Sequence, residues 1–319
     1  MKLLPALLDI PCSGSLAARF VRAAFSRVEG SGVYIKFYRI FSGDEWDNKS
    51  PSVEFGEVHD SHFTRTCTGV VMNDVKALIF DVFGTVVDWR SSVVGELRVL
   101  GERHGAPTDT DWHKFAQAWR SGYMTNTRNI AAGRASGPLN VDAMHRQILD
   151  ELLSSAEWAS VGGLFDEETR QHLNLVWHRL NGWPDTVEGL RALKKQLIIA
   201  TLSNGNVRLL VDMAKHADLP WDVIFSTELF DTFKPNPNAY LEAMRHLSLA
   251  PENCAMVAAH IFDLRAAASL GMKTVYVRRS NEDADAMETG VDIRSKKDGG
   301  DVDCVVDSFT ELATILQTQ

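Results

Sequence analysis

The chain has 319 residues, of which 45% are hydrophobic and 24% are charged, and its formal net charge is −9. These values are typical of a globular protein that is long enough to bury a core. The acidic balance argues against nucleic acid as a partner, because phosphate backbones need a basic surface. No stretch approaches the roughly 18 apolar residues that span a bilayer, so we expect no membrane partner and a cytoplasmic location.

Residues 1–71 mix glycine, serine and aromatic residues without a sustained helical or strand period, and we expect this extension to be poorly ordered. Within it, residues 15–28 carry three arginines beside apolar residues, as a short helix in an organelle transit peptide does, which would indicate a mitochondrial location. Asp9 and the acidic residues in 44–47 argue against that interpretation. The alternative is that native translation begins at Met72 and that the extension is foreign to the native protein.

From Met72 onward, short apolar runs alternate with helical patterns. Unbroken apolar strands that alternate with helices predict an α/β fold, a doubly wound (Rossmann-like) parallel sheet with helices on both faces. Polar residues at the strand exits are then the expected place for a site. The runs cover residues 75–80, 197–202, 223–225, 254–257, 274–277 and 304–306.

The stretch between the first two strands has no strand pattern and is too long for a simple crossover. It predicts four helices, at about residues 91–104, 111–124, 141–156 and 167–180. We therefore expect residues 91–183 to form an inserted helical cap domain that acts as a lid over the strand exits. Residues 72–90 and 184–319 would form the Rossmann-like catalytic core, in which the charged segment 280–303 is predicted to be a loop.

Four polar segments follow strands or begin helices in a fixed order along this core. They are residues 80–88, 201–205, 234–235 and 260–263. In this order they resemble the four motifs of the haloacid dehalogenase superfamily, and residues 115–120 resemble a lid segment of its type II branch, the L-2-haloacid dehalogenases. The resemblance covers residues 74–319 and implies that Asp81, at the end of the first strand, is a nucleophile.

The resemblance implies a hydrolase acting on carbon–halide bonds that uses no metal and no organic cofactor. Asp81 would displace halide from C2 of a short (S)-2-haloacid or a similar carboxylate, and water would hydrolyse the ester to the 2-hydroxy acid. A carboxylate becomes a useful nucleophile when it is desolvated and aimed at its target. Lys234 would keep Asp81 ionised, because an opposite charge within a few ångströms favours the carboxylate form.

The remaining site residues would bind anions or support the second step, in which Asp263 would act. Free backbone N–H groups in a turn after a strand are typical anion-binding donors. The expected anion-binding groups are Arg120 and Asn204 for the halide, and Ser203 with the backbone N–H groups of Val82 and Phe83 for the carboxylates.

Arg120 and Tyr240 each admit a second interpretation. Arg120 borders the apolar face that Trp112 begins on its predicted helix, so it is expected to point under the lid. The alternative is a solvated arginine in a salt bridge. Tyr240 matches a family tyrosine near the active site, and packing in the core is the alternative for it. Thr85 forms the turn and is also expected to bond Asp81.

The fourth segment departs from the family pattern, because the family usually has Ser and Asn where this chain has Ala258 and His260. His260 either activates water, since histidine titrates near neutral pH, or is a structural histidine. Asp263 either orients Lys234 or the water, or serves as the N-terminal carboxylate of the helix that follows.

Phe83 separates two reactions within the superfamily. Phosphatases place a second aspartate at this position to protonate the leaving alcohol, which phenylalanine cannot do and a departing halide does not need. Few oxygen ligands for Mg²⁺ accompany Asp263, so we predict no metal site. Two alternatives stay open, a Mg²⁺-dependent small-molecule phosphatase and a weakly active, fold-retaining binding protein. A homodimer through the lid helices is a family-level expectation.

Overall fold

The computed structural model describes residues 7–11, 20–27, 33–39, 72, 74–137, 139–283 and 293–318. The chain divides into two compact units, Met1–His62 and Phe63–Gln319. In the first unit, three strands form an antiparallel sheet in the order β1-β2-β3. They are β1 (Leu7–Pro11), β2 (Phe20–Arg27) and β3 (Val33–Arg39).

Strand β2 lies inside the segment for which the arginine pattern indicated a helix, so that prediction is wrong for Phe20–Arg27. Because β2 pairs with a strand on each side, its backbone groups bond across the sheet, and these long-range bonds are not visible in the local sequence. The rest of residues 1–71, and with it the prediction of poor order, lies outside the described residues.

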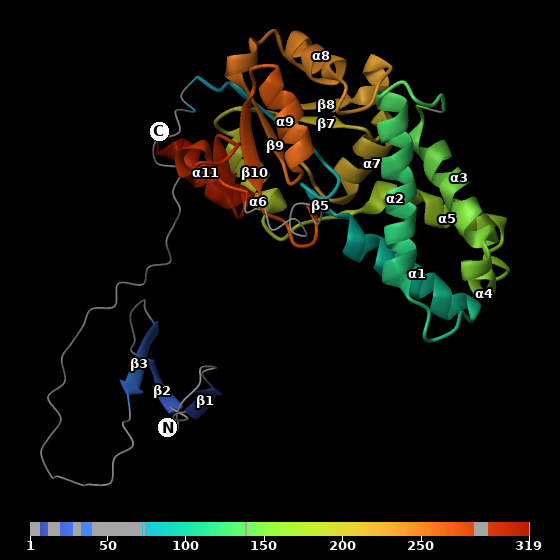
Figure 1. The fold of residues 1–319 in the computed structure, drawn as a ribbon, viewed down its shortest axis with the longest axis horizontal. Helices are drawn as coiled ribbons and strands as arrows, with labels where there is room; N and C mark the ends of the chain where they lie inside the picture. Colours follow the sequence, from blue (N-terminus) through green and yellow to red (C-terminus); the bar gives the residue numbers. More distant parts are fainter. Residues whose placement is uncertain are drawn as a thin grey trace, which may run out of the picture. The chain divides into compact units, whose positions relative to one another are not determined.

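The second unit is built on a six-stranded sheet in which every neighbouring pair is parallel (Figure 1). Its order is β11-β10-β9-β4-β7-β8, so the first strand lies in the middle and the chain then builds outward on both sides. The strands are β4 (Ala77–Phe80), β7 (Ile198–Ser203), β8 (Val223–Ser226), β9 (Cys254–Ala258), β10 (Lys273–Val277) and β11 (Cys304–Val306). The predicted parallel α/β sheet is confirmed, and its strand order reverses beside β4, where such sheets usually bind ligands.

Helices cover both faces of this sheet because successive side chains of each strand point to opposite sides. Leu78 and Phe80 of β4 belong to one buried cluster, which includes side chains of α6, α7 and α11. Ala77 and Ile79 belong to a second cluster with side chains of α8 and α9. These helices are α6 (Thr186–Lys194), α7 (Val207–His216), α8 (Pro237–Leu247), α9 (Ile261–Ser269) and α11 (Phe309–Gln317).

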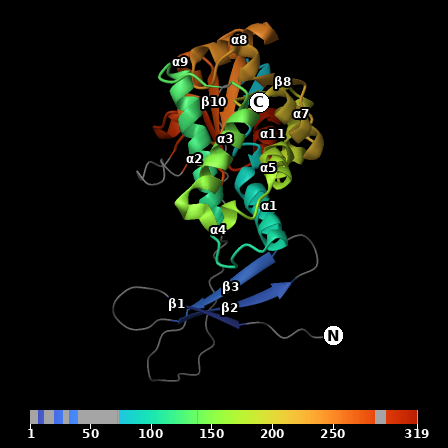
Figure 2. The ribbon, with the colours of Figure 1, turned by 90° about the vertical axis from the view of Figure 1, so that its right-hand side faces the viewer.

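The segment between β5 (Val87–Asp88) and β6 (Asn181–Gly182) forms a group of helices whose two ends lie side by side. Strands β5 and β6 pair antiparallel at these two ends. Figure 2 shows the helices gathered below the sheet. They are α1 (Trp89–His104), α2 (Trp112–Ala131), α3 (Val141–Ser154), α4 (Ala159–Gly162) and α5 (Glu167–Asn174), with the 3-10 helices η1 (Ala156–Trp158) and η2 (Leu175–Arg179).

Side-chain caps begin the longer helices of this group. Asp88, Asp111, Asn140 and Asp166 each accept a hydrogen bond from the backbone N–H three residues ahead, which satisfies a donor that the first turn leaves unpaired. Helix α2 runs past the predicted end at residue 124 to Ala131. The limits of a separate cap domain at 91–183 stay a prediction.

Three further 3-10 helices of the second unit lie outside this helical group: η3 (Thr227–Phe230), η4 (Pro251–Asn253) and η5 (Lys296–Asp298). The last lies in the segment 280–303 that was predicted to be a loop. In the described parts of the chain, no helix combines the length and the apolar character that a membrane span needs.

Candidate active site

Asp81 directly follows β4, at the middle of the sheet edge. Its backbone N–H donates to the carbonyl of Val257 in β9 at 3.0 Å, and the residue is only 8% exposed. The chain then turns sharply, and Gly84 adopts a φ of 84°, which side chains other than hydrogen disfavour. The Val82 carbonyl accepts bonds from the N–H groups of Val86 and Val87, so the turn holds Asp81 in a fixed direction.

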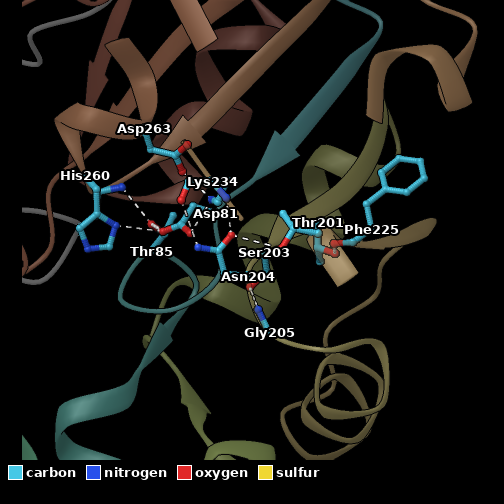
Figure 3. A network of polar contacts seen from close by, with 12 residues as sticks. Asp81, Thr85, Thr201, Ser203, Asn204, Gly205, Phe225, Lys234, His260 and Asp263 are labelled. Carbon is cyan, nitrogen blue, oxygen red and sulfur yellow. Dashed lines mark hydrogen bonds and ion pairs between the residues drawn. The ribbon is translucent and has the colours of Figure 1, made fainter. Parts of the chain in front are cut away.

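Three side chains hold the carboxylate of Asp81 (Figure 3). The Nζ of Lys234 lies 2.9 Å from Oδ1, whereas the Thr85 hydroxyl at 2.7 Å and Nδ1 of His260 at 3.0 Å bond to Oδ2. Burial alone would raise the pKa of Asp81, but the charge of Lys234 and the bond from His260 lower that pKa well below its usual range. Asp81 is therefore an ionised carboxylate that is almost fully removed from water, and the predicted bond from Thr85 is present.

Lys234 lies between two carboxylates. Its Nζ is 2.5 Å from Oδ2 of Asp263, and the hydroxyl of Tyr240 donates to the other oxygen of Asp263. Burial would lower the pKa of Lys234, but Asp263 and Asp81 raise that pKa, so the ammonium is charged. Burial and the neighbouring charge of Asp81 raise the pKa of Asp263, which makes it a stronger base than an exposed carboxylate.

Both interpretations of Asp263 hold together, because the residue contacts Lys234 and also lies in the first turn of α9. Tyr240 is fully buried in a core cluster and its hydroxyl also contacts Asp263, so its two interpretations coexist as well.

The residues of this site do not fit a magnesium ion. The ammonium of Lys234 already lies between the carboxylates of Asp81 and Asp263, and Phe83 stands where a second acid would be needed. Across the described ranges, no group of three or more His, Cys, Asp or Glu side chains is placed to hold a metal.

The loop after β7 supports Lys234 through its backbone. Oδ1 of Asn204 accepts from the backbone N–H of Lys234 at 2.7 Å, and its amide nitrogen donates to the Lys234 carbonyl at 3.4 Å. The hydroxyl of Ser203 accepts from the backbone N–H of Gly205 at 3.2 Å. Both residues line the pocket with Asp81 (Figure 3), but Asn204, which was predicted to bind halide, also fixes the loop that carries the lysine.

Arg120 faces the site from helix α2. The residue is only 7% exposed, so the alternative of a solvated arginine is wrong. Its guanidinium carbon lies 5.4 Å from the ring centre of Phe83 and 5.0 Å from that of Tyr123. Within the described residues, the buried Nη1 atom of Arg120 has no hydrogen-bond partner. A buried cationic donor without a partner is suited to receive an anion.

The backbone of the turn supplies further donors. Among the described parts of the chain, the N–H groups of Val82 and Phe83 make no backbone hydrogen bond, whereas those of Asp81, Gly84, Val86 and Val87 all do. These donors are available to a ligand, and their use for a carboxylate stays a prediction.

Glu282 belongs to the site although sequence reasoning missed it. His260 bonds Asp81 through Nδ1, and its Nε2 lies 3.2 Å from Oε2 of Glu282. The other oxygen of Glu282 accepts from Nε1 of Trp89 at 2.8 Å. A Cβ on Gly84 would lie 2.1 Å from Oε2 of Glu282, so the turn glycine also makes room for this carboxylate. Nothing in the charged loop distinguishes Glu282 from its acidic neighbours before the chain is folded.

Most of these groups line one pocket, to which α2 adds a wall, whereas Thr85, Tyr240 and Glu282 contact residues that line it. Tyr123 and Thr127 follow Arg120 by three and seven residues, a spacing that puts all three on one helical face and that would have revealed them. The lining residues are Asp81, Phe83, Arg120, Tyr123, Met124, Thr127, Arg128, Ser203, Asn204, Lys234, His260, Phe262 and Asp263.

Known proteins are similar to this chain over most of its length. The family model of the haloacid dehalogenase-like hydrolases matches residues 75–271, and a second model, of HAD-hydrolase-like proteins, matches residues 233–312. An (S)-2-haloacid dehalogenase of Pseudomonas fluorescens is 24% identical over 228 residues, which are 69% of this chain and 93% of that protein.

Solved structures give the same picture at higher identity. The L-2-haloacid dehalogenase PA0810 is 34% identical with a TM-score of 0.67, and the match covers 77% of this chain and 100% of the other. The defluorinating L-2-haloacid dehalogenase Rha0230 is 35% identical with a TM-score of 0.67, over 76% of this chain and 95% of the other.

Proposed function

Because the chain belongs to the haloacid dehalogenase-like hydrolases, we propose that it hydrolyses the carbon–halide bond of a short (S)-2-haloacid to give the 2-hydroxy acid. The relatives described above are (S)- or L-2-haloacid dehalogenases, which supports this substrate class. The reaction has two steps, with Asp81 as the nucleophile and an ester of Asp81 between them.

In the first step, the carboxylate of Asp81 attacks C2 and the halide leaves from the opposite side with the bonding electrons. Inversion at C2 follows from this geometry. Lys234 keeps Asp81 ionised, and the free N–H groups of Val82 and Phe83 with Ser203 bind the substrate carboxylate. Arg120, on the α2 side of the pocket, receives the halide, and Asn204 completes that binding.

In the second step, water attacks the carbonyl carbon of the ester and the hydroxy acid leaves. Asp263 accepts a proton from this water, which its raised pKa favours. Tyr240 and Lys234 hold Asp263 in place, and Thr85 and His260 contact the carboxyl group that the water attacks.

One observation carries the proposal. A single pocket brings a buried ionised carboxylate, Asp81, together with a buried guanidinium nitrogen of Arg120 that lacks a partner in the described structure. A displacement that expels an anion needs a nucleophile and an anion acceptor on the two sides of one carbon. Phe83, which lines the same pocket, has no proton to give, and a halide needs none.

The decisive assay measures halide release from L-2-chloropropionate with and without EDTA, beside phosphate release from small phosphomonoesters. We expect halide release that EDTA does not reduce, and no phosphate release. Phosphate release that requires Mg²⁺ would identify the phosphatase alternative. Tight binding of the acid without turnover would identify the fold-retaining binding protein, and either result contradicts the proposal.

A further inference from the structure

The two oxygens of Asp81 have different hydrogen-bond partners. Oδ2 accepts from the Thr85 hydroxyl and from Nδ1 of His260, whereas Oδ1 accepts from Nζ of Lys234 (Figure 3). A carboxylate oxygen has about two lone pairs that accept hydrogen bonds. Two donors therefore occupy Oδ2, whereas Lys234 is the single donor that the described residues place on Oδ1, so Oδ1 has the greater capacity to form a new bond.

We propose that Oδ1 is the attacking oxygen and that Oδ2, held by Thr85 and His260, becomes the oxyanion of the second step, with Glu282 keeping His260 protonated. This inference rests on the proposed function, since it assigns parts to the ester intermediate. The donors stand within 3.0 Å of Oδ2 before the reaction starts, as oxyanion-stabilising groups must.

The electrons follow from this assignment. Oδ1 bonds to C2 as halide leaves, so Oδ2 is the carbonyl oxygen of the ester. Water oxygen then bonds to the carboxyl carbon, and the carbonyl electron pair moves onto Oδ2. This pair returns when the bond from the carboxyl carbon to Oδ1 breaks. The hydroxy acid leaves with Oδ1 and one proton of the water, passed through Asp263, and the second proton goes to solvent.

His260 needs a second carboxylate because the reaction removes the charge of the first. Its side chain is 13% exposed and that of Glu282 is 6% exposed, so the pair is shielded from water. Burial would lower the pKa of His260, but the bonds from Asp81 and Glu282 raise that pKa to about 10. When Asp81 is an ester, Glu282 is the carboxylate that still holds the proton on His260.

The charges around His260 come from several elements. Asp81 follows β4, Glu282 follows β10, and Lys234, which bonds the other oxygen of Asp81, also bonds Asp263 of α9. Asp283 accepts from the backbone N–H beside His260, at Ile261, and Arg128 of α2 lies over the neighbouring ring of Phe262.

The test follows the pre-steady state of L-2-chloropropionate turnover by the full chain, with substrate in excess over enzyme. In His260→Ala, ester hydrolysis should slow about 100-fold, as removal of an oxyanion donor does elsewhere. Halide should then appear as a burst of one equivalent per enzyme, and intact-mass measurement should show the acid attached to Asp81. His260→Asn keeps a neutral donor and should recover part of the rate. His216→Ala, at an exposed histidine of α7, should behave as the unchanged chain.

Glu282→Gln gives an independent readout that does not depend on the fold of the His260 variants. Without this carboxylate, the pKa of His260 in the ester falls, so its proton is lost at lower pH. As pH rises, the rate of the hydrolysis phase should therefore begin to fall at a lower pH in Glu282→Gln than in the unchanged chain. The burst phase should keep its pH profile. A purely structural role for Glu282 would change both phases together.

The outcomes separate the two proposals. Halide release by the unchanged chain, with variants that slow the burst and accumulate no adduct, would overturn this inference and leave the dehalogenase proposal standing. No halide release by the unchanged chain would overturn both. An adduct in His260→Ala and a shifted hydrolysis profile in Glu282→Gln would support the inference. Either result alone would support the role assigned to the residue that was changed.

Discussion

Two histidines of this chain each lie between two carboxylates, yet only one of them lies in the pocket. His260 bonds Asp81 and Glu282, and His178 in η2 lies 3.0 Å from both Asp142 of α3 and Asp212 of α7. The partners of His178 are 27% and 31% exposed, whereas those of His260 are 11% and 6% exposed. The same local chemistry is thus placed once at the reacting carboxylate and once at a junction between helices.

The difference lies in what else contacts the aspartate that bonds each histidine, which is Asp81 for His260 and Asp142 for His178. Asp81 is bonded by the ammonium of Lys234 and lines the same pocket as Arg120, so it is ionised and placed where a ligand can bind. Asp142 is bonded by His178 and by the side-chain amide of Asn206, and it does not line the pocket. A carboxylate bridged by histidine is therefore not reactive by itself, since the neighbouring charge and the pocket decide its role.

The two histidine sites should differ most when the aspartate that bonds each histidine is removed in turn. Asp81→Asn should reduce halide release by about 10⁴-fold or more, because an amide oxygen is a poor nucleophile and the variant forms no ester. Steady-state halide release measures this directly.

Asp142→Asn is the matched control, since it removes a carboxylate that also bonds a histidine. It should keep halide release near that of the unchanged chain. Equal losses in the two variants would mean that Asp81 acts through structure alone.

Lys234→Met is expected to have the next largest effect. Removing one partner of a buried ion pair leaves uncompensated charge that costs roughly 3–5 kcal/mol, and Asp81 and Asp263 would then share a proton. The pKa of Asp81 would rise, so the nucleophile would be neutralised as pH falls. We expect about a 10³-fold loss of kcat near pH 7, which becomes deeper at acid pH, measured as a pH–rate profile.

Lys194→Met tests whether any lost ion pair has this result. Lys194 pairs with Asp222 at 2.8 Å, but both side chains are about one-third exposed. Such pairs contribute about 0–1 kcal/mol, so activity and its pH profile should stay unchanged. An unchanged profile in Lys234→Met would show that His260 alone keeps Asp81 ionised.

The sheet and the strand-exit residues could be predicted from the sequence because parallel strands end at one edge. Asp81, Ser203 and Asp263 follow or adjoin strands that neighbour one another in the order β9-β4-β7, so their meeting follows from the topology. Each apolar run that identified a strand is short and local, which is the kind of pattern a single sequence carries.

The parts that could not be predicted depend on contacts without a local pattern. Glu282 meets Trp89 across 193 positions of the chain, and its loop has no period that directs one carboxylate inward. His178, Asp142 and Asp212 likewise come from three separate helices. The hydrogen bonds of Asn204 to Lys234 were missed because the sequence gives the residue type but not which backbone lies beside it.

Arg120→Gln sharpens the comparison from the side of α2. Its guanidinium is the expected halide acceptor, so the variant should lower kcat/KM about 100-fold, as loss of a transition-state donor does. The loss should be seen in single-turnover halide release. Arg146→Gln, in an arginine that bonds Asp150 and Glu167 outside the pocket, should leave that rate unchanged. Similar rates for Arg120→Gln and the unchanged chain would mean that the halide leaves elsewhere.

His178→Gln should have the smallest effect, and this effect should be on the stability of the fold and not on catalysis. Burial lowers the pKa of His178, but its bonds to Asp142 and Asp212 raise that pKa above the usual value, with Arg208 bonded to Asp212 nearby. A raised folded-state pKa gives stability that is fully present below the unfolded pKa of about 6.5 and is lost as pH rises through the folded value.

The loss of stability in His178→Gln should therefore be largest near pH 6, at about 1–2 kcal/mol in the free energy of unfolding or a few degrees in Tm. This loss should shrink at higher pH. Thermal unfolding across pH measures it, with His216→Gln as an exposed control that should show no such trend. A deficit that grows with pH would mean that the neutral ring makes the stabilising contacts. Halide release should persist in His178→Gln, because neither of its carboxylates changes charge during the reaction, whereas one partner of His260 does.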